Sequence, residues 1–124
     1  VGDTMAVTKT TISNPLAATL ILDSEANATS EDGVLGQASL FYFVEIDNTL
    51  NTHVTYVKLA KDASVTVGTS APPWIFPVPA ATKITYVIGA GFYTTNISFW
   101  AVQEAAASGT TAPENAVSVE ILAT

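Results

Sequence analysis

The chain has 124 residues, no cysteine and a formal net charge of −7, because eleven carboxylates face only four lysines. Without cysteine there can be no disulfide framework, thiolate zinc site or cysteine nucleophile, and the acidic balance makes nucleic acid and membranes poor partners. At this length we expect a single domain spanning residues 1–124.

Apolar and polar residues alternate along the whole chain, with β-branched residues enriched, and no long segment keeps a helical period. We therefore predict an all-β protein. In chain order the predicted strands are Met5–Ser13, Leu16–Asp23, Ala38–Asn48, His53–Ala60, Trp74–Val78, Lys83–Gly89, Asn96–Gln103 and Asn115–Leu122. Eight short strands separated by turn residues predict an antiparallel β-sandwich, either jelly-roll or immunoglobulin-like.

No signal peptide is expected, because no basic segment followed by an apolar run begins the chain. The uncharged stretch from Ile84 to Gln103 is as long as a membrane span, but its threonines and glycines interrupt it. We predict two strands there, joined by a turn at Gly89–Gly91.

An acidic segment, Asp23–Gly33, separates the second and third strands. Asp23, Glu25 and Asn27 place oxygen atoms at alternating positions, as a calcium loop does, but Ala28 stands where such a loop needs glycine for its sharp turn. A looser calcium site and a solvated acidic loop both fit this segment. We expect the solvated loop, with no metal and no cofactor.

The third strand assigns its two faces by its period of two. One face ends in Glu45 and Asp47 and is predicted to point outward, which also turns Phe41 and Phe43 outward. The opposite face is predicted to enter the core and carries Leu40, Tyr42, Val44 and Ile46.

The later strands follow the same rule. Val57 and Leu59 are expected in the core opposite Lys58, and further core positions are Ile84, Tyr86, Ile88, Ile97, Phe99, Ala101, Val117, Val119 and Ile121. Trp100 then lies on the more polar face of its strand. Three prolines within or beside Trp74–Val78 place that strand at a sheet edge or at a bulge, because proline cannot donate to a β-ladder.

Large apolar residues opposite the core face form the candidate interface, which comprises Phe41, Phe43, Trp74 and Trp100. Such side chains either meet a partner or are covered by a loop or by the second strand layer. Both alternatives are open at the level of sequence.

Catalytic patterns are weak. His53 is the single histidine and no Gly-x-Ser-x-Gly elbow exists, so a nucleophile triad is not expected. Glu45 and Asp47 lie two residues apart, as a glycosidase pair might, but nothing else indicates a sugar cleft. We predict that the chain is not an enzyme.

From Phe43 onward, six motifs follow one another in a fixed order: Val44-Glu-Ile-Asp-Asn48, Tyr56-Val-Lys-Leu59, Thr66-Val-Gly-Thr69, Pro73–Pro79, Gly91-Phe92 and Asn115–Leu122. This order resembles a group of small phage virion structural proteins. The resemblance implies a capsid decoration (cement) protein that stabilises a phage head by packing on the major capsid protein, or a component of the tail. It also implies a virion location after assembly in the host cytoplasm, and we expect self-association.

The alternative function is a carbohydrate- or receptor-binding β module of a tail fibre. In that case Trp74, Phe76 and Tyr93 would form an aromatic platform on which sugar rings stack.

Overall fold

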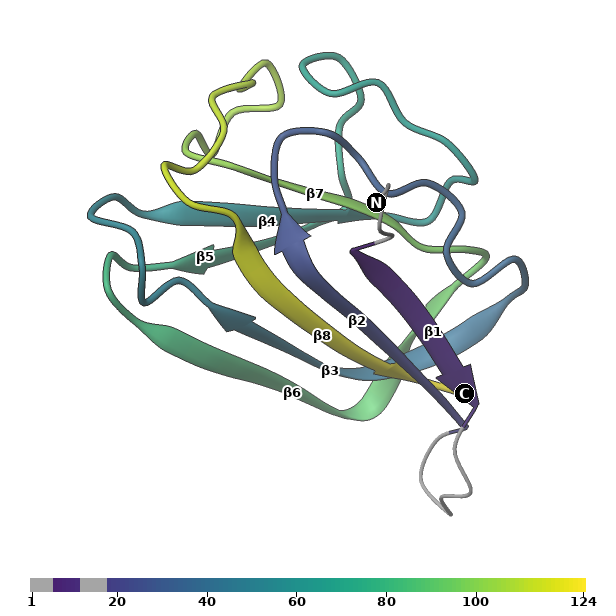
Figure 1. Cartoon of the computed structure of the whole chain (residues 1–124). Helices are drawn as coiled ribbons and strands as arrows, with labels where there is room; N and C mark the ends of the chain where they lie inside the picture. Colours follow the sequence, from purple (N-terminus) through teal and green to yellow (C-terminus); the bar gives the residue numbers. More distant parts are fainter. Residues whose placement is uncertain (1–5, 12–17) are drawn as a thin grey trace.

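The computed structural model describes residues 6–11 and 18–124 and consists of β-strands in two sheets (Figure 1). The strands are β1 (Val7–Thr11), β2 (Thr19–Ala26), β3 (Ser39–Asp47), β4 (Thr55–Ala60), β5 (Trp74–Val78), β6 (Lys83–Thr94), β7 (Ser98–Val102) and β8 (Val117–Ala123). The all-β class and the eight strands are confirmed. The predicted strand ends at Met5, Ser13 and Leu16 lie outside the described residues.

The strand order is that of a long hairpin rolled into two layers. The larger sheet has the order β1-β2-β8-β3-β6 and the smaller has β5-β4-β7. Strands equidistant from the middle of the hairpin pair antiparallel, β4 with β5, β3 with β6 and β2 with β8. Segment 27–34 continues the series beside β7, because Glu31 and Phe99 exchange backbone hydrogen bonds of 2.9 and 3.1 Å. Of the two predicted architectures, this connectivity is that of the jelly roll.

The edges of the smaller sheet are protected in two different ways. β5 is an edge strand, which is one of the two positions that its prolines predicted, and Pro77 lies opposite Tyr56 of β4. The other edge, β7, is covered by segment 27–34, which receives a further hydrogen bond of 2.8 Å from the Ala101 amide to the Asn27 carbonyl. Neither edge therefore offers a free ladder for strand addition.

The core lies between the two sheets and contains the inward residues of every central strand. The predicted core positions of the fourth, seventh and eighth strands are confirmed, since Val57, Leu59, Ile97, Phe99, Ala101, Val117, Val119 and Ile121 are all fully buried. Ile84, Tyr86 and Ile88 of β6 pack against this cluster while partly exposed, as expected for a strand at the sheet edge.

The prediction for Phe41 is wrong, and a β-bulge in β3 is the reason. Phe41 pairs with Ala123, and Phe43 pairs with the neighbouring residue Leu122. Over this step β3 uses two residues where β8 uses one. The extra residue reverses the alternation at Tyr42. Phe41 consequently points into the core, where it is 0% exposed, and Leu40 and Tyr42, expected inside, are only half-buried. Beyond the bulge Val44 and Ile46 are buried as predicted.

The turn predicted at Gly89–Gly91 is also wrong, because these residues lie within β6, which continues to Thr94. The register with β3 shifts here, from Phe43 opposite Val87 to Phe41 opposite Phe92. Gly91 has a φ of +79°, and a Cβ at this position would come within 3.0 Å of the Tyr42 ring. The sheet therefore bends at a residue that must lack a side chain. No helix in the described part of the chain has the length and apolarity to cross a membrane.

Candidate interaction surface

Trp100, a predicted interface residue, is 0% exposed and lies beneath loops. It belongs to a small second cluster with Ala60 and Val102, on the side of the smaller sheet that faces away from the core, and Ala28, Val65 and Val67 pack over it. Of the two alternatives for Trp100, the structure thus places it under a loop cover. Its surface role is a wrong prediction, because the loops that cover it come from distant parts of the chain.

Lys58 shares this covered side, since it pairs with Trp100 across β4 and β7. It is also 0% exposed, and its Nζ donates a hydrogen bond to the Ala106 carbonyl. Burial lowers the pKa of Lys58, and the negative charge of Glu104 opposes that shift. The sequence pattern placed Lys58 opposite the core but contained no signal for its burial.

Trp74 of β5 is half-buried in an aromatic cluster with Phe41 of β3 and Phe92 of β6. Its ring stacks on Phe92 with 5.8 Å between centroids, and it forms a T-shaped pair with Phe41 at a centroid distance of 5.0 Å. Phe76 is buried and contacts Tyr86 instead, while Tyr93 follows Phe92 in β6 and points to the opposite face. Trp74, Phe76 and Tyr93 therefore do not form the aromatic platform that sugar binding would need.

Phe43, by contrast, lies on the outer face of the larger sheet, defined as the surface that points away from the smaller sheet. Direct pairing aligns Leu20 of β2 with Leu122 of β8, Leu122 with Phe43, and Phe43 with Val87 of β6. Paired residues share a face, so these four side chains form one apolar row across four strands. Val87 is 76% exposed, whereas Leu122 is only 8% exposed between its neighbours in the row.

Carboxylates lie next to this apolar row on the same outer face. Glu45 pairs with Glu120, and Asp47 pairs with Ser118 and Lys83. A shallow hollow is lined by Glu45, Asp47, Lys83, Ser118 and Glu120. The Thr49 hydroxyl and then its backbone N–H donate to Asp47 and lower the pKa of that carboxyl. We call Glu45, Asp47 and Glu120 the acidic patch; with the apolar row it forms the candidate interaction surface.

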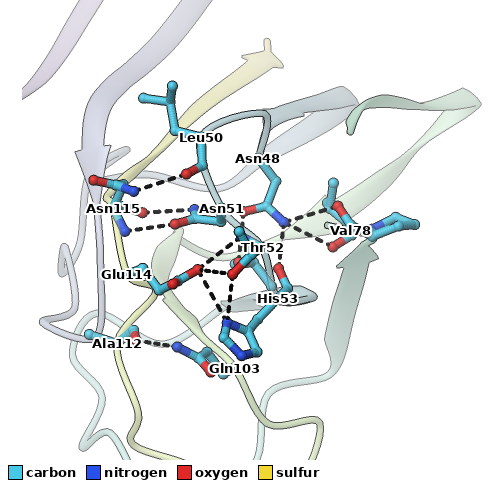
Figure 2. A network of polar contacts seen from close by, with 12 residues as sticks. Asn48, Leu50, Asn51, Thr52, His53, Val78, Gln103, Ala112, Glu114 and Asn115 are labelled. Carbon is cyan, nitrogen blue, oxygen red and sulfur yellow. Dashed lines mark hydrogen bonds and ion pairs between the residues drawn. The ribbon is translucent and has the colours of Figure 1, made fainter. Parts of the chain in front are cut away.

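A separate polar network joins the two sheets at the end of β3 (Figure 2). Asn48 is fully buried, and its Nδ2 donates to the carbonyls of His53, Val78 and Pro79 at 3.0–3.2 Å. Its Oδ1 accepts from Asn51 and from the Thr55 hydroxyl, each at 2.8 Å. The amide therefore holds the loop between β3 and β4 against the end of β5, which is a structural role.

His53 and Glu114 lie at the exposed rim of this network. Glu114 Oε1 accepts from both the amide and the hydroxyl of Thr52 at 2.8 Å and contacts His53 Nδ1 at 3.2 Å. These contacts lower the pKa of Glu114 to about 2, with those of Thr52 contributing most. A catalytic triad places the imidazole between hydroxyl and carboxylate, using both ring nitrogens. Here the Thr52 hydroxyl and the Glu114 carboxylate both contact Nδ1 of His53, and the hydroxyl donates directly to the carboxylate. The arrangement therefore lacks the geometry of a triad.

Two carboxylates of the acidic segment are removed from solvent to different extents, since Asp23 is fully buried and Glu31 is partly exposed. Asp23 is 0% exposed on the core side of β2, and Glu31 shares the inward face of Phe99. Burial raises the pKa of Asp23, and burial followed by the charges of Asp23 and Asp32 raises the pKa of Glu31. Asp23 Oδ2 has no hydrogen-bond partner among the described residues. The expected solvated loop is thus wrong for Asp23, which is buried within a strand, whereas Glu31 stays partly exposed while its backbone pairs with β7.

The pKa shift of Asp23 predicts a pH-dependent destabilisation. Because its folded pKa is raised, the protonated form stabilises the fold below the unfolded pKa near 3.8, and this stability is lost as pH rises through the folded pKa. Asp23→Asn should therefore raise the free energy of unfolding by about 1 kcal/mol at pH 7, with little effect at pH 3. Urea unfolding of both proteins at the two pH values measures this, and a variant less stable than wild type at pH 7 contradicts it.

Within residues 6–11 and 18–124, no group of three or more histidine and carboxylate side chains is placed to hold a metal ion. The molecule is a jelly-roll β-sandwich. Its most distinctive accessible feature is the outer face of the larger sheet. Comparison of the chain with protein-family models, with curated proteins and with solved structures found no match. Fold and surface chemistry are therefore the basis for assigning a function.

Proposed function

We propose that the chain is a non-enzymatic virion structural protein, and specifically a capsid decoration (cement) protein that stabilises a phage head by packing on the major capsid protein. The observation that carries this proposal is the apolar row of Leu20, Leu122, Phe43 and Val87 across the outer face. A cement protein needs a stable scaffold and a flat face that becomes buried on assembly, and exposed apolar patches are typical of binding surfaces.

Two further observations support the proposal. The motif order of the last two-thirds of the chain resembles small phage virion proteins, and the jelly roll is a fold that viral capsid proteins use. The second point is an analogy of fold, which by itself does not define function. Many copies on one shell would also add avidity, so each contact could be weak.

The proposal is tested with particles that lack the chain. Purified protein is added to such particles from a phage that encodes it, and its occupancy is measured by sedimentation and cryo-electron microscopy. We expect saturable binding to the head and a higher temperature of head disruption. An unrelated acidic β-sandwich of similar size is the control. Binding to the tail alone, or no binding together with absence of the chain from purified virions, would contradict the proposal.

A further inference from the structure

We infer that the outer face of the larger sheet binds a protein surface on which lysine or arginine side chains flank an apolar strip, and that its occupant is not a second copy of this chain. The inference rests on the proposed virion function, because it specifies the chemistry of the partner for that binding. It is carried by the arrangement of charges around the apolar row.

The apolar row supplies the part of the contact that excludes water. Phe43 is half-buried at its centre and Val87 is 76% exposed at one end. Leu22, which is 38% exposed, lies one row away opposite Glu120. Apolar side chains bordered by charged ones match the layout of an interface with an apolar centre and a polar rim.

The acidic patch determines which partner fits. Glu45 and Glu120 lie directly opposite each other on β3 and β8, a position at which like charges destabilise a sheet. Lys83 is the one cationic side chain lining this hollow, and its Nζ lies 3.7 Å from Glu45. The patch therefore keeps an excess of negative charge, which a basic partner would neutralise on binding.

A second copy of the chain would not neutralise it. In a two-fold stack of two outer faces, each copy would add its own excess of carboxylates to the same interface, because such an interface uses the same surface twice. Juxtaposed like charges oppose binding, and each chain already carries a net charge of −7. If the chain self-associates, we expect another surface to mediate the contact.

Two substitutions test the inference on the phage particles described above. Glu120→Lys places a cation opposite Glu45, so the fold should be as stable as wild type or more stable, while affinity for the particle falls at least about tenfold. Val87→Asp introduces a charge at the exposed end of the row and should weaken binding to a similar extent. Raising the salt concentration should weaken wild-type binding, because salt screens the charge pairs.

Matched controls separate surface effects from general ones. Asp62→Lys changes the net charge as Glu120→Lys does, but in an exposed loop away from the outer face, and Ile75→Asp charges an exposed position on β5 of the other sheet. Both controls should bind like wild type. Normal binding by Glu120→Lys and Val87→Asp overturns the inference and leaves the proposed function intact. Absence of wild-type binding together with absence of the chain from purified virions overturns both. Sedimentation that shows a dimer of the wild type, lost in Val87→Asp, identifies a second copy as the occupant and also overturns the inference.

Discussion

Phe41→Ala is expected to lower the free energy of unfolding by about 3–5 kcal/mol, the cost of removing a buried phenylalanine and leaving a cavity. Phe41 is 0% exposed in the core, and its ring meets Trp74 and Phe92 edge-on with centroids at 5.0 and 5.6 Å. Its loss would therefore also remove two aromatic contacts that join β3 to β5 and β6. Urea unfolding monitored by tryptophan fluorescence measures the change.

Phe43→Ala is the matched control, since it deletes the same side chain two positions along the same strand. Phe43 lies on the outer face and is half-buried, so we expect a loss of about 1 kcal/mol or less in the isolated chain. Phe43→Ala should nevertheless weaken binding to the particle, although the stability of the isolated chain changes little. Equal destabilisation by the two substitutions, or a larger loss for Phe43→Ala, would show that β3 lacks the bulge.

Asn48→Ala is expected to cost about 3–4 kcal/mol, because it removes one buried amide that several groups share. Without it the Asn51 amide and the Thr55 hydroxyl lose an acceptor, and the Val78 carbonyl loses a donor. An unsatisfied buried polar group costs about 1–3 kcal/mol. Thermal and urea unfolding should both show the loss, and the loop between β3 and β4 should gain hydrogen exchange.

Two variants define the origin of that loss. Asn48→Asp keeps the acceptor oxygens but sets a carboxylate against the carbonyls of His53, Val78 and Pro79, so it should be nearly as destabilising at pH 7. Asn115→Ala removes an exposed amide that donates to the Leu50 carbonyl, and should cost less than about 1 kcal/mol. A cost below 1 kcal/mol for Asn48→Ala itself would mean that the network does not hold the two sheets together.

Sequence reasoning missed Asn48, Lys58 and the acidic patch as structural or surface features. Asn48 and Asn115 lie far apart in the chain and meet through Asn51, so no local motif could reveal the network. Lys58 was assigned to the correct side of its strand, but its cover comes from a loop near Ala106. The pairing of Glu45 with Glu120 follows only from the register of β3 and β8.

The all-β class, the eight strands, the exclusion of β5 from the centre of its sheet and the core residues of β4, β7 and β8 could all be predicted from the sequence. These features depend on local properties, namely the period of two, turn residues and the missing amide hydrogen of proline. The jelly-roll pairing, the inward side of Phe41, the cover over Trp100 and the alignment of the apolar row depend instead on how the strands and loops pack in three dimensions. A single extra residue at Tyr42 inverts a strand, and a loop from elsewhere in the chain can bury an outward side chain. Both effects arise from contacts between segments remote in sequence, which alternation along one strand does not encode.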